Sequence, residues 1–215
     1  MSTIQTKQNR LNHILALAPV VPVVIMEQLA HAVPMARALV AGGLPAIEVT
    51  LRTPVALEAI RAIAAEVEGA VVGVGTVLDA GQLAAAREAG AQFAVSPGSS
   101  PRLLDAADDD SLPLLPGAAT ASEAMALLER GYGLQKFFPA VPAGGVKLLS
   151  AWASPLPQIT FCPTGGISLA SAPEFLDLPN VVCVGGSWLT PKDRLQTGNW
   201  AGIETLAREA RALRA

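Results

Sequence analysis

The chain has 215 residues, of which 51% are hydrophobic and 15% are charged, so it is long enough for one sizeable core and is not a disordered polypeptide. The net charge of −3, with no basic stretch, argues against a nucleic-acid-binding protein. Two cysteines, Cys162 and Cys183, are too few for a disulfide framework or a zinc site. We expect both to be reduced and buried in a cytoplasmic protein.

The first 18 or so residues are expected to form a short helical segment of a single domain over residues 1–215. The apolar run from Ile14 to Met26 has the length of a signal-peptide core, but Pro19 and Pro22 interrupt it. Removing it would delete the first predicted strand, and it is too short to span a bilayer. We therefore interpret this run as part of the fold and expect no membrane partner.

Apolar, β-branched runs begin every 20 to 26 residues along the chain. This interval fits one strand, one helix and two short loops. The predicted strands are Val20–Ile25, Ala46–Val49, Val71–Val74, Phe93–Val95, Pro113–Leu115, Leu134–Phe138, Ile159–Cys162 and Val181–Val184.

The segments between these runs carry the residues that begin helices. Thr53 and Ser100 each precede a proline, a pair typical of an N-cap followed by the first helical position. Asp79 is a third expected N-cap, and Thr120 with Glu123 forms the pattern of a capping box.

Strands that alternate with helices predict a parallel sheet with right-handed crossovers. Eight such units in about 200 residues favour an α/β protein with a (β/α)8 TIM-barrel fold. A doubly wound open sheet is the alternative, but a nucleotide-binding version needs a glycine fingerprint after its first strand. Here the first strand ends in Ile25, Met26 and Glu27, and the pair Gly73 and Gly75 lacks the third glycine.

Two charged residues are predicted to point into the barrel. Side chains alternate along a strand, so Glu48 in the second run and Lys136 in the sixth run face inward with Phe138. A buried carboxylate is costly unless it is paired or used, and a structural ion pair is the alternative to a catalytic role. A lysine in a desolvating interior is a candidate Schiff-base nucleophile.

The charge of Glu48 creates a conflict, because an ionised carboxylate close to Lys136 favours the ammonium form. We expect Arg52 to offset this carboxylate, or Glu48 to act at longer range through a water molecule. Lys147 follows a Gly-Gly pair and is expected on the surface.

Glycine-rich loops follow the last two predicted strands. Gly165 and Gly166 follow the seventh, and Gly185, Gly186 and Ser187 follow the eighth. Glycine lets backbone N–H groups approach an anion, and loops at these strands of a barrel often hold phosphate. The sequence therefore predicts a phosphate-binding site without a basic residue. No residues have metal-ligand spacing, and we expect no metal or other cofactor.

Together these motifs resemble the 2-dehydro-3-deoxyphosphogluconate (KDPG) and 4-hydroxy-2-oxoglutarate (KHG) aldolase family. The resemblance covers the chain from about Ile14 to Ala212. The matching segments are Glu48-Val49-Thr50-Leu51-Arg52, Val72-Gly73-Val74-Gly75-Thr76-Val77, Phe93-Ala94-Val95-Ser96-Pro97-Gly98, Lys136-Phe137-Phe138-Pro139, Phe161-Cys162-Pro163-Thr164-Gly165-Gly166-Ile167 and Gly185-Gly186-Ser187-Trp188.

The resemblance implies a homotrimeric class I aldolase, a carbon–carbon lyase of the Entner–Doudoroff pathway. It implies cleavage of 2-dehydro-3-deoxy-6-phosphogluconate, a phosphorylated 2-keto-3-deoxy sugar acid, to pyruvate and D-glyceraldehyde 3-phosphate, with side activity on 4-hydroxy-2-oxoglutarate. Lys136 resembles the imine-forming lysine and Glu48 the proton shuttle. The positions that resemble the site for the carboxylate and keto end of the substrate are Arg52, Thr76, Thr164, Pro97 and Phe138.

Other readings remain open on the sequence. The same family includes aldolases that prefer the galactonate epimer, which differs only at C4. A phosphosugar isomerase or a barrel that binds a metabolite without converting it would keep the fold. One departure from the family bears on substrate preference: members often carry a basic residue just after the first strand, where this chain has Met26 and Glu27.

Overall fold

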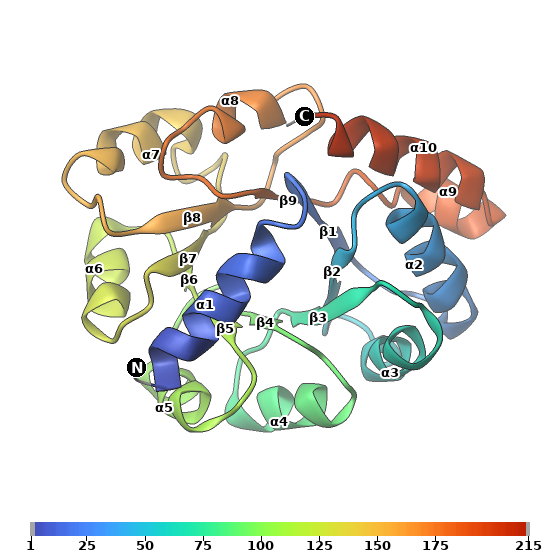
Figure 1. Ribbon diagram of the computed structural model, residues 1–215, viewed down its shortest axis with the longest axis horizontal. Helices are drawn as coiled ribbons and strands as arrows, with labels where there is room; N and C mark the ends of the chain where they lie inside the picture. Colours follow the sequence, from blue (N-terminus) through green and yellow to red (C-terminus); the bar gives the residue numbers. More distant parts are fainter. Residues whose placement is uncertain (1–2, 214–215) are drawn as a thin grey trace.

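The computed structural model describes residues 3–213. Parallel strands curl around a common centre and helices form the outer layer (Figure 1). The strands are β1 (Val20–Val24), β2 (Ala46–Thr50), β3 (Val71–Gly75), β4 (Ala94–Val95), β5 (Leu114–Leu115), β6 (Gly117–Ala118), β7 (Leu134–Phe137), β8 (Thr160–Pro163) and β9 (Val184–Gly186).

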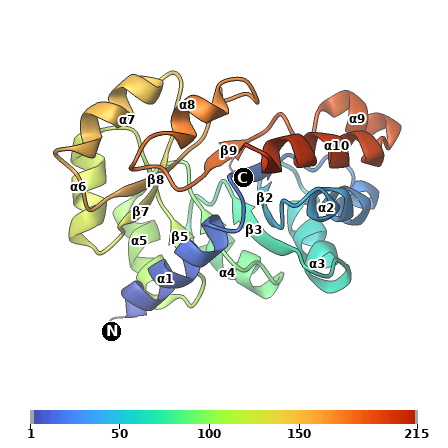
Figure 2. The same cartoon turned by 45° about the horizontal axis from the view of Figure 1, so that its top comes forward.

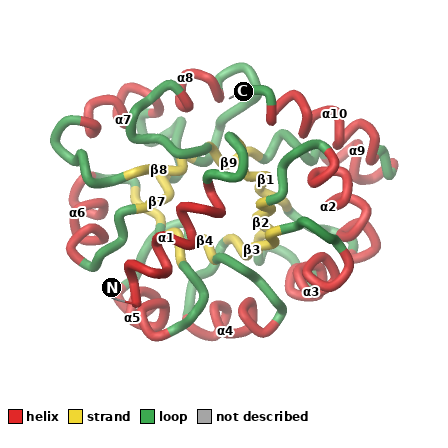
Figure 3. Tube along the Cα trace, viewed as in Figure 1, coloured by secondary structure: helices red, strands yellow, loops and turns green. Residues whose placement is uncertain are grey.

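The helices alternate with the strands and lie outside them (Figure 3). They are α1 (Thr3–Leu15), the 3-10 helix η1 (Leu29–His31), α2 (Ala32–Ala41), α3 (Ala56–Glu66), α4 (Ala80–Glu88), α5 (Pro101–Asp109), α6 (Ala121–Glu129), α7 (Gly145–Ala153), α8 (Ala172–Leu176), α9 (Lys192–Thr197) and α10 (Trp200–Arg211). Within the described residues, no helix is both long and apolar enough to cross a bilayer.

The strands form two parallel sheets, in the orders β5-β4-β3-β2-β1-β9 and β6-β7-β8. Pro116 alone separates β5 from β6, and its carbonyl accepts a hydrogen bond of 2.9 Å from the amide of Lys136. On the other side, isolated bridges pair Phe161 with Val181 and Thr164 with Gly185. The α/β class and the parallel pairing predicted from the sequence are confirmed.

Seven of the predicted runs overlap a strand, and in the eighth only Val184 does. Its earlier residues lie before β9, where Val181 makes only the isolated bridge to Phe161. The two-residue strand β6 was not predicted, because Gly117 and Ala118 carry no apolar, β-branched pattern.

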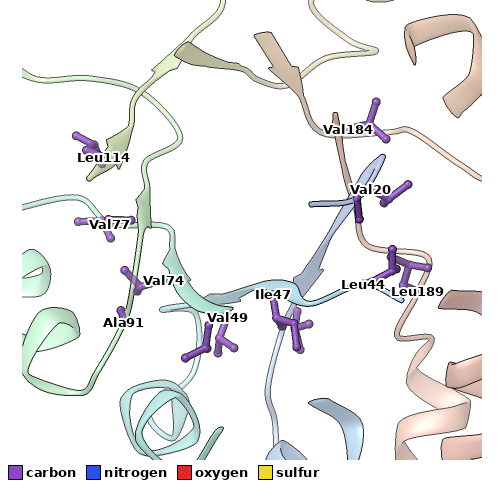
Figure 4. Close-up of a cluster of buried hydrophobic side chains, with 14 of the residues drawn as sticks. Val20, Leu44, Ile47, Val49, Val74, Val77, Ala91, Leu114, Val184 and Leu189 are labelled. Carbon is purple, nitrogen blue, oxygen red and sulfur yellow. The ribbon is translucent and has the colours of Figure 1, made fainter. Parts of the chain in front are cut away.

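Apolar side chains on the outer face of the strands pack under the helices. Figure 4 shows Ile47, Val49 and Val74 pointing away from the space that the strands enclose, and all three are fully buried. This layer accounts for the recurring apolar runs, because each strand needs side chains that fit beneath a helix.

Helix α1 crosses the ends at which the strands begin (Figure 2). Its Leu11, Ile14 and Leu15 are buried among inward-facing residues of the strands. Gln8 of the same helix accepts a hydrogen bond of 2.9 Å from the amide of Leu134, at the start of β7. The segment expected as a short N-terminal helix therefore closes one end of the strand assembly; residues 1–2 of that segment lie outside the described residues.

Three of the four expected N-caps are confirmed. Asp79 and Ser100 accept from amides three residues ahead, and Thr120 with Glu123 makes both bonds of a capping box. The expectation for Thr53 is wrong, since α3 begins at Ala56 and the Thr53 hydroxyl donates instead to the carbonyl of Met26. That bond ties the loop after β2 to the loop after β1, a contact between distant segments that local spacing does not encode.

Candidate active site

Glu48 of β2 and Lys136 of β7 meet inside the ring of strands. Lys136 Nζ lies 3.3 Å from Glu48 Oε1, and each side chain is only 4% exposed. Side chains alternate along a strand, so the residues before and after Glu48 and Lys136 face the helices while these two face inward. Both charged groups thus face the space that the strands enclose, as the alternation of side chains predicts.

Small residues make room for this pair. A Cβ at Gly75, the register partner of Thr50, would lie 2.2 Å from Glu48 Oε1. Gly117 is the register partner of Lys136, and a Cβ there would lie 2.4 Å from backbone atoms of Pro97. Gly75 therefore leaves space for the Glu48 carboxylate, and Gly117 lets its strand pass close to the backbone of Pro97.

Lys136 contacts a carboxylate and an aromatic ring. The carboxylate contact is direct, so an interaction through a water molecule, one of the two sequence-based alternatives, is wrong for this structure. Lys136 Nζ lies over the ring of Phe138, 5.1 Å from the ring centroid, at the distance of a cation–π contact. Transfer of one proton from Lys136 to Glu48 gives a neutral amine beside a neutral acid, which is the state that a nucleophile requires.

Arg52 and Thr76 lie together where β2 and β3 end. Arg52 Nε donates a 3.2 Å hydrogen bond to Thr76 Oγ1, and no ion pair joins Arg52 to Glu48 among residues 3–213. Thr76 has φ of 61°, a left-handed conformation that costs a non-glycine residue about 1 kcal/mol. The pair places a guanidinium and a hydroxyl at the edge of the site, suited to bind a carboxylate.

Thr164 supplies a buried hydroxyl that has no hydrogen-bond partner among the described residues. It is two residues beyond Cys162, the register partner of Lys136, and therefore faces the same interior. A Cβ at Gly185 would lie 2.2 Å from Thr164 Oγ1. Gly185 is a strand residue of β9 that leaves room for this hydroxyl.

The two glycine pairs lie on neighbouring strands, which the bridge between Thr164 and Gly185 joins. Gly185 and Gly186 belong to β9 itself, so the expectation that they follow the last strand as a loop is wrong. Gly165 and Gly166 have φ of 105° and 78°, which glycine alone adopts without strain. Gly186 ends β9 under the ring of Trp188, and Ser187 is exposed beyond it. Gly166 and Ser187 are exposed, so an anion can approach the backbone there from solvent.

Sequence reasoning noted Glu27 only as a departure from the family and assigned no role to it or to His31. Glu27 and His31 line, with Ser187 and Lys192, a hollow of about 180 Å³ between the loops after β1 and β9. Glu27 and Lys192 are 165 positions apart, so no local spacing reveals their contact. Only their shared position, just after the first and last strands of a barrel, could have suggested it. No group of metal-ligating side chains is found among residues 3–213.

The model of the family described as KDPG and KHG aldolase matches residues 11–206. The chain is similar to the KHG/KDPG aldolase of Escherichia coli strain K12, with 56% identity over 197 residues that make up 92% of each chain. It is also 50% identical to the 2-dehydro-3-deoxy-phosphogluconate aldolase of Zymomonas mobilis, over 95% of this chain and 96% of that protein.

Solved structures agree with this similarity. The 2-keto-3-deoxy-6-phosphogluconate aldolase of Zymomonas mobilis with 3-phosphoglycerate has a TM-score of 0.90 at 50% identity, over 94% of this chain and 95% of that one. The KDPG aldolase of Legionella pneumophila, with pyruvate captured as a covalent carbinolamine, has a TM-score of 0.91 at 44% identity, over 93% and 97%.

Proposed function

Because this chain belongs to the KDPG and KHG aldolase family, we propose that it cleaves 2-dehydro-3-deoxy-6-phosphogluconate to pyruvate and D-glyceraldehyde 3-phosphate. The protein is an aldolase, a carbon–carbon lyase. The observation that carries the proposal is the direct contact of Lys136 with Glu48, each of which is only 4% exposed. The carbinolamine in the Legionella relative supports covalent chemistry at a lysine.

In the proposed mechanism, the neutral amine of Lys136 attacks the C2 carbonyl to form a carbinolamine. Glu48 donates the proton that it received from Lys136 to the carbinolamine hydroxyl, which leaves as water, so that a protonated imine and an ionised Glu48 remain. The imine accepts the electron pair of the C3–C4 bond as that bond breaks, which forms an enamine. Glu48 takes the proton from the C4 hydroxyl, so the aldehyde is released. Return of a proton to C3 and hydrolysis of the imine release pyruvate and the free lysine.

The remaining site residues follow from their positions. We assign the substrate carboxylate and keto group to Arg52, Thr76 and Thr164. Arg52 and Thr76 are hydrogen-bonded to each other, and the buried hydroxyl of Thr164 has no partner among the described residues. Pro97 and Phe138 form walls of the same space.

The phosphate is assigned to the loops after β8 and β9. The residues that contact it are Gly165, Gly166, Gly186 and Ser187. Gly185 contributes to this end of the site by leaving room for Thr164.

We further propose that the two sheets join into a complete (β/α)8 barrel that forms a single domain. The bond from Lys136 to Pro116 on one side and the bridge from Thr164 to Gly185 on the other support closure. The resemblance to the family suggests a homotrimer that needs no cofactor. A cytoplasmic setting suits Cys162 and Cys183, which form no disulfide and are buried with their sulfurs 3.5 Å apart.

The family name and the Escherichia coli relative suggest 4-hydroxy-2-oxoglutarate as a second substrate. The galactonate epimer remains an alternative substrate, because nothing in the site distinguishes the two configurations at C4. A phosphosugar isomerase or a binding barrel is the other alternative, and it would use Lys136 only as a charge.

Borohydride reduction in the presence of pyruvate tests the proposal. We expect a stable added mass on Lys136, and Lys136→Ala should lose both the adduct and the release of pyruvate. Lys147→Ala is the matched control, because Lys147 is an exposed residue of α7 and should leave both unchanged. An adduct on Lys147, or turnover without any adduct, would overturn the assignment. Turnover of both C4 epimers, measured in parallel, identifies the preferred substrate.

A further inference from the structure

The hollow between the loops after β1 and β9 contains an ion pair that the proposed chemistry does not use. Lys192 Nζ lies 3.1 Å from Glu27 Oε1, and the two side chains are 68% and 55% exposed. Ser187, assigned above to the phosphate, lines the same hollow of about 180 Å³. The ion pair therefore lies beside the phosphate end of the site.

A phosphate monoester carries between one and two negative charges near neutral pH, and the proposed cradle offers no cation to match it. Gly165, Gly166, Gly186 and Ser187 contribute backbone amides and one hydroxyl. Among the described residues that line the hollow, Lys192 carries the one permanent positive charge. Arg52 is bonded to Thr76 at the ends of β2 and β3, on the side assigned to the substrate carboxylate.

We propose that Lys192 binds the phosphate end of the substrate and that Glu27 is a positioning residue, which competes with the phosphate for the ammonium group. This inference rests on the proposed function. Lysine has a long, flexible side chain with three rotatable donors, so its ammonium can leave Glu27 for an anion at Ser187 without movement of the backbone. Because both partners are largely exposed, the contact between them is weak and an incoming phosphate can replace it.

The two family substrates should respond differently to this charge. In 2-dehydro-3-deoxy-6-phosphogluconate the phosphate is attached at C6, whereas 4-hydroxy-2-oxoglutarate ends in a carboxylate attached to C4. The shorter substrate holds its terminal charge nearer the imine and away from the hollow. Lys192 is thus a residue that determines specificity for the phosphorylated substrate.

The experiment measures KM and kcat for both substrates in Lys192→Gln, Lys192→Arg and Glu27→Gln. For the phosphorylated substrate, Lys192→Gln should raise KM roughly threefold to tenfold with kcat changed less than twofold, since a rim charge contributes to binding. The ratio of the two kcat/KM values should fall accordingly, and Lys192→Arg should restore it. Glu27→Gln should lower the KM for the phosphorylated substrate about twofold, because Lys192 is then free.

The double variant Glu27→Gln/Lys192→Gln tests whether Glu27 acts through Lys192. The effect of Glu27→Gln should vanish in the Lys192→Gln background. Glu204→Gln is the matched control, because Glu204 forms an exposed ion pair with Arg208 in α10, and the substrate ratio should stay unchanged. Additive effects in the double variant would refute the role of Glu27, and an unchanged ratio in Lys192→Gln would refute the proposal.

Borohydride trapping with pyruvate separates this inference from the function on which it rests. Pyruvate carries no phosphate, so Lys192→Gln and the parent protein should trap it equally at Lys136. A parent protein that fails to form the adduct contradicts the proposed function itself. An intact adduct with an unchanged substrate ratio contradicts only the role of Lys192.

Discussion

At the scale of single residues, the site depends on missing side chains as much as on present ones. Glu48 faces Gly75 and Thr164 faces Gly185. A Cβ added at either glycine would lie 2.2 Å from a side-chain oxygen of the residue that it faces. Each glycine carries only a hydrogen atom where another residue would carry its Cβ. The space left free holds the Glu48 carboxylate and the Thr164 hydroxyl. Their orientation is set by the backbone of the neighbouring strand.

Gly75→Ala tests this dependence. The added methyl group must displace the Glu48 carboxylate, and misplacement of a catalytic group by about 1 Å can cost roughly a hundredfold in rate. We expect kcat/KM to fall by about that factor. Gly133→Ala is the control, because a Cβ there meets its nearest atom, the carbonyl oxygen of Gln158, at an ordinary 3.5 Å. Equal activity in both variants, with urea unfolding curves alike, would show that the carboxylate does not need this space.

At the scale of elements, α1 is joined to the strands by polar as well as apolar contacts. Lys7 Nζ donates to the carbonyl oxygens of Ala107, Asp108 and Asp110, at the end of α5. The side-chain oxygen of Gln8 accepts a hydrogen bond from the amide of Leu134, at the buried end where the strands begin. These bonds fix the position of α1 across strands that are far away in the sequence.

Gln8→Leu should destabilise the protein by about 1–3 kcal/mol, because it leaves a buried backbone amide without an acceptor. Urea denaturation followed by circular dichroism measures the change. Asn12→Leu makes a similar polar-to-apolar change at an exposed position of the same helix and should shift the free energy of unfolding by less than about 0.5 kcal/mol. A similar loss in both variants would point to surface hydrophobicity instead of the buried bond.

The capping box of α6 predicts a pH effect. The amide of Ala119 donates to Glu123 and lowers the pKa of that carboxyl, and the hydroxyl and amide of Thr120 add to the effect. A carboxyl whose pKa is lower in the folded state stabilises the fold above its unfolded pKa, and this contribution is lost as the pH falls through the folded pKa. Between about pH 5 and pH 3, the free energy of unfolding should therefore fall more steeply in the parent protein than in Glu123→Gln.

Glu129→Gln is the matched control for this effect, because Glu129 is exposed at the other end of α6. Its pH profile should have the same slope as that of the parent. Chemical denaturation at a series of pH values gives both slopes. Parallel profiles for the parent and Glu123→Gln would show that the capping box does not contribute to the loss of stability in acid.

At the scale of the whole molecule, the sequence predicted the elements that repeat and missed the contacts between them. The strands were visible because each needs an apolar outer face, and Glu48 and Lys136 stood out as charges at inward positions of two such strands. Their direct contact depends on the curvature of the sheet, which a period of two does not encode. The same limit hid the bond from Thr53 to Met26 and the pair of Glu27 with Lys192.

Helix α1 lies across the end where the strands begin, so the enclosed space is reached from the opposite end, where Ser187 is exposed. In the proposed mechanism, the half of the cleaved sugar acid that stays attached to Lys136 is the inner one, and the half with the phosphate lies between it and the solvent. The products should therefore leave in a fixed order, the aldehyde first and pyruvate second. In the reverse direction pyruvate must enter before its partner.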